Sequence, residues 1–292
     1  MEFKHFSEDD YEALCTFLIE LNQEDRTHIN WNWARFEWMY EHPEFDKKSK
    51  SAVGLWKDGE KIIGAAIYDM YFGEAFCAVL PGYETFYPEI LEYARQELRD
   101  GDGLETAVCD KDVPAIGAVK QAGFEKADQT ETIMKLELER HFPAKLPEGF
   151  TFAELDFAKE DIRELQWLFW QGFDHGEDRA EFEAEFEKTK DQELRIRRHF
   201  DPYLSIAVVD SSGNKAAYCC LWHDSRTDYA YLEPLCTVPA YRGKGLARAV
   251  VFEALNRVKT LGAKSVYVIS DLPFYGKIGF TEDRHYTFYW NK

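Results

Sequence analysis

The sequence predicts an α/β protein, more closely an α+β one, with two tandem domains that each have a mixed, mostly antiparallel sheet flanked by helices. The chain has 292 residues, which suits two domains of about 150 residues each. The stretch SAVGLWKDGEKIIGAAIYD begins at Ser51 and resembles SIAVVDSSGNKAAYCCLWHD, which begins at Ser205. Further on, QAGF ends at Phe124 and KIGF ends at Phe280. The two pairs recur at offsets of 154 and 156 residues, so we expect a duplicated domain.

The boundary between the domains is predicted from HFPAKLPEGF, residues 141–150, where two prolines and a glycine interrupt the periodic patterns. We therefore assign residues 1–143 to the first domain and residues 144–292 to the second.

The elements of the second domain follow from its apolar spacing. The helix expected over Lys159–Gly172 has its apolar residues on one side, and the helix over Gly243–Leu261 stops at Gly262, a typical residue just beyond a helix end. The remaining elements are a strand at Phe150–Leu155, an acid-rich helix at Ala180–Arg198, strands at Tyr203–Val209, Lys215–Trp222, Tyr229–Val238 and Lys264–Ser270, a helix at Pro273–Ile278 and a strand after Phe280. The first domain fits the same order, with a helix at Glu84–Arg99. This order predicts hairpins and one parallel junction rather than a doubly wound sheet.

Composition limits the classes of partner. Hydrophobic residues make up 45% of the chain and aromatic residues 16%, enough for sizeable cores. The net charge is −19 and the pI is about 4.9, so the chain repels phosphate backbones. We expect neither nucleic acid nor an anionic membrane as a partner. Cationic or neutral small molecules suit this charge better.

No targeting or membrane segment is predicted. The longest apolar run, Ala216–Trp222, is far shorter than the ~18 residues that a spanning helix needs. The N-terminal MEFKHFSEDD has neither a basic nor an apolar leader region. The six cysteines show no CxxC pair and no zinc spacing. We expect a cytoplasmic protein in a reducing compartment, with no metal.

The segment VPAYRGKGLARAVV, from Val238 to Val251, has the character of a phosphate-binding loop. Glycines between a strand and a helix let backbone amides converge, and the helix N-terminus adds about half a positive charge. Arg242 and Lys244 can add charge, and Ala247 keeps the first helical turn thin. The alternative is an ordinary glycine-rich connection, but cations at a helix N-terminus oppose its dipole unless an anion is bound. Neither a Walker motif nor a Rossmann fingerprint fits.

At this point the second half resembles the GNAT superfamily of acyl-CoA N-acyltransferases. Its signature [QR]xxGx[GA] is matched by Arg242, Gly245 and Ala247, and its later Tyr before a Gly-Phe pair is matched by Tyr275 with Gly279–Phe280. The resemblance covers about residues 150–292 strongly, and residues 1–140 only in architecture. In tandem proteins of this superfamily one half is often inactive.

The resemblance implies acetyl-CoA as the co-substrate and a set of binding residues. The strand ending at Val238 would splay from its parallel neighbour and pair with the pantetheine arm, and Tyr275 would lie near the thioester sulfur. Ser270–Asp271 stand where many members have an Asn. The implied acetyl-CoA contacts are Cys236, Thr237 and Val238 for pantetheine, and Arg242, Gly243, Lys244, Gly245, Leu246, Ala247 and Arg248 for the pyrophosphate loop.

Acyl transfer to an amine needs an acid and a base. Tyr275 is the candidate general acid that protonates the departing thiolate, with packing beside Phe274 as the alternative. Glu233 is the candidate base, because period-two alternation places it on the same side of its strand as Leu235 and Thr237. A structural role for Glu233, with a water chain as the base, is the alternative.

The first half lacks this machinery. At the same offsets, Tyr87, Ile90 and Glu92 stand in place of the signature residues, and Val119 stands in place of the tyrosine. We therefore expect no CoA binding there. The aromatic segment Trp31–Tyr40 either packs in the core or lines an acceptor groove.

The leading hypothesis is an N-acetyltransferase that moves an acetyl group from acetyl-CoA to a primary amine of a small molecule by direct attack on the thioester. The alternative is a non-catalytic acyl-CoA-binding sensor or scaffold. An aminoacyl-tRNA-dependent transferase would need a basic face, which the charge disfavours. We expect a monomer or a homodimer.

Overall fold

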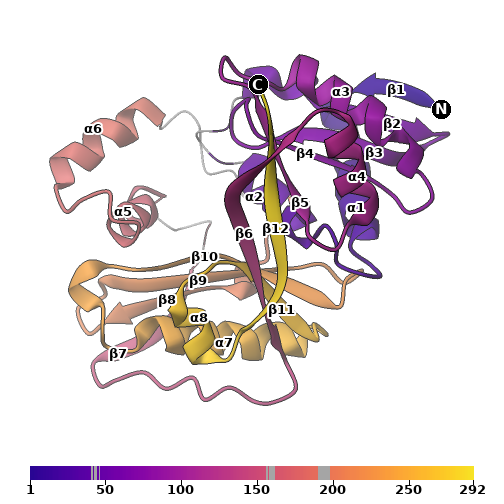
Figure 1. Cartoon of the computed structure of the whole chain (residues 1–292). Helices are drawn as coiled ribbons and strands as arrows, with labels where there is room; N and C mark the ends of the chain where they lie inside the picture. The colour runs from indigo at the N-terminus through magenta and orange to yellow at the C-terminus, as the bar shows by residue number, and fades with distance from the viewer. Residues whose placement is uncertain (41, 43–44, 46, 156, 158–161, 190–197) are drawn as a thin grey trace. The chain divides into compact units, whose positions relative to one another are not determined.

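The computed structural model describes residues 1–40, 42, 45, 47–155, 157, 162–189 and 198–292 (Figure 1). They form two compact units. The first unit contains Met1–Met134, Ile269–Gly276 and Thr281–Lys292, and the second contains Lys135–Val268 and Lys277–Phe280. None of the described helices is both long enough and apolar enough to cross a membrane.

The first unit has two sets of paired strands. Its elements are β1 (Glu2–His5), α1 (Tyr11–Leu21), α2 (Trp33–Tyr40), β2 (Gly54–Asp58), β3 (Lys61–Tyr68), β4 (Ala75–Val79), α3 (Tyr87–Glu97), β5 (Leu104–Cys109), α4 (Val113–Gln121), β6 (Glu125–Glu137) and β12 (Thr281–Asn291). The strand orders are β1-β2-β3-β4 and β5-β12-β6. A parallel bridge joins Glu74, beside β4, to Glu105 of β5.

The aromatic segment near residue 31 belongs to the core of the first unit. Trp31, Trp33 and Phe36 are each at most 3% exposed. Trp31 stacks on Phe76 of β4, with 5.6 Å between the ring centroids. Core packing, rather than a groove, therefore accounts for these three side chains.

The second unit has one sheet with helices on both faces. Its elements are β7 (Phe150–Glu154), α5 (Ile162–Gly172), α6 (Arg179–Thr189), β8 (Ser205–Asp210), β9 (Lys215–His223), β10 (Tyr229–Thr237), α7 (Leu246–Thr260), β11 (Ser265–Ile269) and, shared between the units, α8 (Pro273–Ile278). The strand order is β6-β11-β10-β9-β8-β7. Helix α7 packs on β8, β9 and β10, and α5 packs on β9 and β10 (Figure 1).

The last strand of each sequence repeat joins the other repeat's sheet. Strand β12 pairs with β5 in the first unit, where Tyr286 lies opposite Cys109. Strand β6 adjoins β11 in the second unit, where the Leu138 amide donates to the Lys264 carbonyl. The boundary predicted at residue 143/144 divides the two sequence repeats. The compact units have different bounds, because the first unit includes the last strand of the second repeat, and the second unit includes the end of the last strand of the first repeat.

Most predicted elements lie close to their observed bounds, and α8 has the predicted ones. Helix α7 begins three residues later than predicted, because Gly243 and Gly245 have left-handed backbone angles. The predicted residues 159–161 of one helix and 190–197 of the other lie outside the described residues. The mixed α/β class, with one parallel pair, β10 with β11, among the registers given for the second unit, is confirmed.

Candidate functional site

Strands β10 and β11 separate after a short parallel stretch. Their pairing runs from Tyr229 opposite Ser265 to Tyr231 opposite Tyr267, while β10 itself continues to Thr237. The rest of β10 therefore turns one backbone edge toward the opening between the strands, where an extended ligand can add as a further strand.

Backbone alternation decides which groups of β10 face this opening. The Val238 amide donates to the Ala216 carbonyl of β9 at 3.0 Å. In an antiparallel pair every second residue bonds to the same neighbour, so Cys236 also directs its backbone toward β9. Leu235 and Thr237 then direct theirs toward the opening. The amide of Val238, which we expected to contact pantetheine, is engaged within the sheet instead.

A bulge in β10 changes the position of Glu233. The register with β9 shifts between Leu232 and Leu235. The Glu233 carboxylate accepts a hydrogen bond from the Tyr231 hydroxyl at 2.8 Å, so these side chains share a face. The cross-strand partners place Leu235 and Thr237 on the opposite face. The expectation that Glu233 lies beside Leu235 and Thr237 is wrong, because the bulge inserts one residue into the alternation.

Helix α5 covers the face that carries Glu233. Phe169 of α5 contacts Tyr218 of β9 at 5.1 Å between ring centroids. A Cβ atom on Gly172 would lie 2.7 Å from both Cβ and Sγ of Cys236, so the helix end needs glycine to approach this closely. Burial raises the pKa of the Cys236 thiol to about 12, which keeps the thiol protonated at neutral pH.

The loop after β10 has the geometry of an anion cradle. Gly243 and Gly245 have φ values of +76° and +79°, and a Cβ atom on either would meet nothing within 4 Å. Helix α7 begins at Leu246, and the amides of a first helical turn have no partner within the helix. Two left-handed glycines followed by these amides leave backbone N–H groups in open space, an arrangement that suits an anion.

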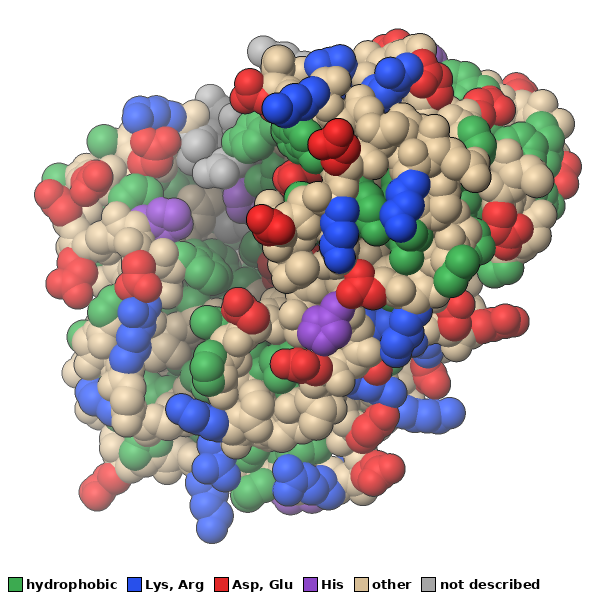
Figure 2. Space-filling model, in the orientation of Figure 1, with side chains coloured by type: hydrophobic (Ala, Val, Ile, Leu, Met, Phe, Trp, Pro, Cys, Tyr) green, Lys and Arg blue, Asp and Glu red, His purple; other side chains and the backbone are tan. Residues whose placement is uncertain are grey.

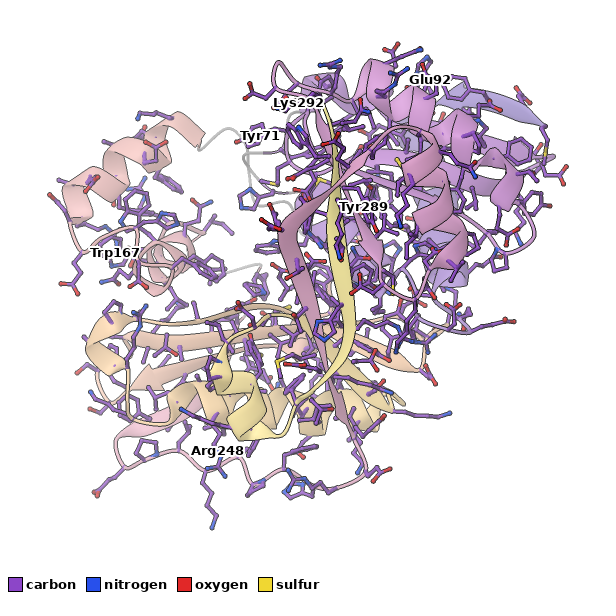
Figure 3. The ribbon with its side chains drawn as sticks, in the orientation of Figure 1. Tyr71, Glu92, Trp167, Arg248, Tyr289 and Lys292 are labelled. Carbon is purple, nitrogen blue, oxygen red and sulfur yellow. The ribbon has the colours of Figure 1, made fainter. Side chains whose placement is uncertain are left out.

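The three basic residues of the loop have different roles. The Arg242 guanidinium donates to the carbonyls of Thr237 at 3.0 Å and Gly172 at 3.1 Å, and it pairs with Asp174 at 2.9 Å. These three contacts fix the loop to the end of α5. The sequence predicts a different role for Arg242, which is to add positive charge beside the loop amides. Lys244 lies over the Tyr241 ring, and Arg248 projects from the first turn of α7 over Phe252 (Figure 3). Neither has a carboxylate partner among the residues that the structure describes.

Tyr241 holds the start of the loop against the sheet. Its hydroxyl donates to the Asp210 carboxylate at 2.7 Å. Hydrogen bonds from Asn214 and then from Tyr241 hold the pKa of Asp210 well below its usual range, so this carboxylate stays charged at neutral pH. The Lys244 ammonium, 4.9 Å from the Tyr241 ring centroid, is thereby kept beside the loop.

Tyr275 lies on α8, as the sequence predicts, and belongs to the first compact unit. Its side chain is 7% exposed and packs edge-on against Phe274, with 5.2 Å between centroids. The predicted binding residues Cys236–Val238 and Arg242–Arg248 all lie in the second unit.

The corresponding loop of the first unit has one left-handed glycine, Gly82, whose amide donates to the Glu84 carboxylate at 2.9 Å and is thereby engaged. Helix α3 begins at Tyr87 after a turn of 3₁₀ helix, and Ile90 is fully buried against Gly64. Glu92 pairs with Arg95 at 2.6 Å, and Val119 is 2% exposed. Each residue that replaces a signature position thus has an ordinary structural role.

Two residues at this site, Gly172 and Tyr231, were not predicted from the sequence. Gly172 closes an apolar helix, and a glycine at that position is the one signal of close packing that the sequence contains. Tyr231 precedes Glu233 by two residues on the same strand, so alternation places both side chains on one face, and this spacing is the signal that could have found the contact.

Comparison with known proteins places these features in context. Residues 159–280 match the model of the acetyltransferase (GNAT) family. The chain is 27% identical over 114 residues to the uncharacterized N-acetyltransferase YhbS of Escherichia coli (strain K12), a match that covers 37% of this chain and 66% of the relative. The chain therefore spans just under two thirds of that relative's length.

Two solved structures are similar to nearly the whole chain. A tandem GNAT protein from the clavulanic acid biosynthesis pathway aligns with a TM-score of 0.63 at 16% identity, over 99% of this chain and 98% of that one. A GCN5-related N-acetyltransferase from Sphaerobacter thermophilus aligns with a TM-score of 0.56 at 15% identity, over 99% and 95% of the two chains. At these identities the likeness concerns the fold alone.

Proposed function

We propose that this chain is a tandem member of the GNAT superfamily, whose acetyltransferase-family model matches residues 159–280. In this proposal it transfers an acetyl group from acetyl-CoA to a primary amine of a small molecule. One observation carries the proposal above all. In the second unit, β10 continues past its pairing with β11 toward the loop with the left-handed Gly243 and Gly245, and α7 begins directly after that loop.

The residues of the second unit fit acetyl-CoA. The amide and carbonyl of Leu235 and the amide of Thr237 face the opening, where they can pair with the pantetheine arm, whereas the Thr237 carbonyl already accepts a hydrogen bond from Arg242. The buried Oγ1 of Thr237 has no hydrogen-bond partner within the described chain, which supports a ligand beside it. The amides from Gly243 to Arg248, together with Lys244 and Arg248, would hold the pyrophosphate.

The chemistry then needs one proton removed and one supplied. The acceptor nitrogen attacks the thioester carbonyl, a C–N bond forms, and the C–S bond breaks. In this proposal the Glu233 carboxylate takes the proton from the amine, directly or through water. The Tyr275 hydroxyl gives a proton to the departing CoA thiolate.

The pairing of Glu233 with Tyr231 supports this assignment. A hydrogen bond of 2.8 Å from Tyr231 fixes the carboxylate, and the Glu233 carbonyl accepts the Trp222 indole N–H at 2.6 Å. Both partners belong to the sheet, so the candidate base is held on rigid elements. The net charge of −19 favours a cationic acceptor over an anionic one. On the face shown in Figure 2, acidic and basic side chains are interspersed.

A coupled CoA-release assay with a panel of primary amines tests the proposal. Acetyl-CoA should bind at one site per chain, and at least one amine should accelerate CoA release above the hydrolytic background. Tight binding of acetyl-CoA with no turnover for any amine would favour the alternative, an acyl-CoA-binding sensor or scaffold. Cytoplasmic location and a monomeric or homodimeric state are part of the same proposal.

A further inference from the structure

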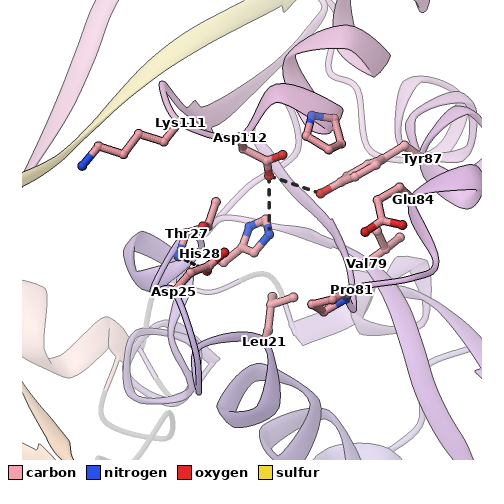
Figure 4. Close-up of a pocket in the computed structure, with 11 residues that line it drawn as sticks. Leu21, Asp25, Thr27, His28, Val79, Pro81, Glu84, Tyr87, Lys111 and Asp112 are labelled. Carbon is pink, nitrogen blue, oxygen red and sulfur yellow. Dashed lines mark hydrogen bonds and ion pairs between the residues drawn. The ribbon is translucent and has the colours of Figure 1, made fainter.

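The first compact unit contains a cavity of about 200 Å³ that the proposed reaction does not use (Figure 4). Apolar side chains from the ends of α1 and β4 form part of its wall. Its polar lining consists mainly of three carboxylates, one ammonium, one imidazole and one phenol, which belong to Asp25, Glu84, Asp112, Lys111, His28 and Tyr87.

The cavity occupies the position in the first unit that the CoA loop occupies in the second. It lies where β4 ends and α3 begins, beside the start of α4. The sign of its charge is reversed. The second unit has Lys244 and Arg248 after its strand β10, whereas the first unit has Glu84 after β4, and Asp112 adds a second carboxylate from the start of α4. An anionic phosphate is disfavoured in such a lining, and a cation is favoured.

Asp112 is the centre of the polar lining. Its Oδ1 caps α4 by accepting the Ala115 amide at 2.9 Å. Its Oδ2 lies 3.5 Å from the Tyr87 hydroxyl and 3.6 Å from His28 Nε2, both at or beyond the limit of an ordinary hydrogen bond. Among the described residues, the Oδ2 atom of this carboxylate, which is 8% exposed, has only these long contacts, so it is able to accept a stronger donor.

The neighbours of Asp112 do not neutralise its charge. Burial lowers the pKa of His28, which leaves the imidazole neutral at pH 7. Burial and the adjacent Asp112 raise the pKa of Tyr87 well above its usual range, so the phenol is neutral as well. Figure 4 shows the Lys111 side chain pointing away from the Asp112 carboxylate. The net charge of the lining is thus negative.

The wall of the cavity is fixed in advance. The hydroxyl of Tyr286, which is 1% exposed, donates to the Thr27 carbonyl at 2.8 Å. Arg284 donates to the Asp25 carbonyl, and the Thr27 amide donates to the Asp25 carboxylate at 2.9 Å. The last strand therefore holds the loop that carries Asp25 and His28, and little ordering is needed when a ligand binds.

We propose that this cavity binds a small organic ammonium ion, which donates to Oδ2 of Asp112 while its alkyl part packs on the apolar wall. A cavity of about 150 Å³ accommodates benzene, so the space here suits an amine of roughly four to six carbon atoms. This site is separate from the acetyl-CoA site proposed above and does not depend on it.

Calorimetric titration of the full chain with butylammonium chloride at pH 7.5 tests the proposal. Butylammonium should bind with millimolar or tighter affinity, and sodium butyrate, an anion of the same length, should not bind. Asp112→Asn keeps an efficient helix cap but removes the charge, so it should weaken binding about tenfold to a hundredfold. Lys111→Gln should tighten binding, because it removes the opposing charge.

Two controls locate the binding site. Glu60→Gln removes a fully exposed carboxylate of the same unit and should leave affinity unchanged. Glu233→Gln alters the candidate acceptor site of the second unit and should also leave affinity unchanged. Absence of butylammonium binding, equal binding of butyrate, or loss of binding in Glu233→Gln but not in Asp112→Asn would each overturn the proposal. If Asp112→Asn does not fold, Lys111→Gln provides the test. An unchanged affinity of Lys111→Gln for butylammonium would then overturn the proposal.

Discussion

The guanidinium of Arg242 donates a hydrogen bond to the carbonyl of Gly172 at 3.1 Å and so joins the pyrophosphate loop to the C-terminal end of α5. The same guanidinium reaches Thr237 and Asp174. Arg242 therefore positions this loop, and in the proposed function the charge offered to a bound anion comes from Lys244 and Arg248.

Arg242 and Arg248 are expected to respond differently to salt. Arg242→Ala should weaken acetyl-CoA binding by releasing the loop, with little change in the dependence of affinity on salt concentration. Arg248→Ala removes a charge that we propose lies close to the pyrophosphate. The variant should therefore bind acetyl-CoA more weakly than native protein at low salt, and its affinity should depend less on salt concentration. Calorimetry between 50 mM and 300 mM NaCl distinguishes the two. A shallower salt dependence in Arg242→Ala would show that its guanidinium contacts the phosphates.

Gly172 should not tolerate a side chain. Gly172→Ala places a Cβ atom 2.7 Å from Cys236, and such overpacking should lower the free energy of unfolding by about 1–3 kcal/mol. Gly117→Ala in α4 is the matched control, because its Cβ meets open space and alanine favours a helix. Urea denaturation measures both. Combining Gly172→Ala with Cys236→Ala removes the Sγ atom and should recover part of the lost stability, and equal loss in the single and double variants would contradict the contact.

Tyr275→Phe tests the proposed general acid. The ring and its packing on Phe274 remain, but the proton for the thiolate is lost. We expect kcat to fall by about 10²–10⁴-fold while the Kd of acetyl-CoA stays nearly constant, because the group acts in the transition state. The fall should lie at the low end, since a thiolate of pKa near 8.5 is already a fair leaving group. The pH–rate profile should lose its alkaline limb if chemistry limits turnover, and an unchanged kcat would leave Tyr275 with packing alone.

Glu233→Gln tests the proposed base. The amide keeps the size of the side chain and an acceptor for Tyr231, so the fold should be unaffected. Turnover should fall by about 10²–10⁴-fold, and the acidic limb of the pH–rate profile should disappear. Glu253→Gln, at a half-buried position of α7 where the carboxylate pairs with Arg257, is the control and should not change turnover. Equal rates in native protein and Glu233→Gln would point to a water chain as the base.

Local signals in the sequence were enough for much of the fold. Glycines at 243, 245 and 262 mark both ends of α7, and the turn residues around Pro273 fix α8. These features depend on the conformational range of single residues, which the sequence states directly. The left-handed turn at Gly243 and Gly245 could be predicted for the same reason, while the binding of a pyrophosphate there stays a prediction.

Features that depend on distant contacts could not be predicted. The pairing of β12 with β5 joins residues about 180 apart, and no local pattern distinguishes it from a hairpin within one repeat. The bulge beside Glu233 reverses the face assigned by alternation, and two partners of Arg242, Gly172 and Asp174, lie about 70 residues earlier at and just beyond the end of α5. Each is decided by packing, which residue spacing does not reveal.

The proposed function depends most on a single acetyl-CoA site at the loop between β10 and α7 of the second unit. Calorimetric titration of Gly245→Glu with acetyl-CoA tests this claim most directly, with Gly262→Glu as the control. Both glycines have positive φ and border open space, so glutamate at either position introduces the same kind of backbone strain and the same charge. The two positions differ in that they lie at opposite ends of α7. We expect one acetyl-CoA site per chain in native protein and in Gly262→Glu, and no acetyl-CoA binding in Gly245→Glu. Retained affinity in Gly245→Glu, or two equivalent sites in native protein, would contradict it.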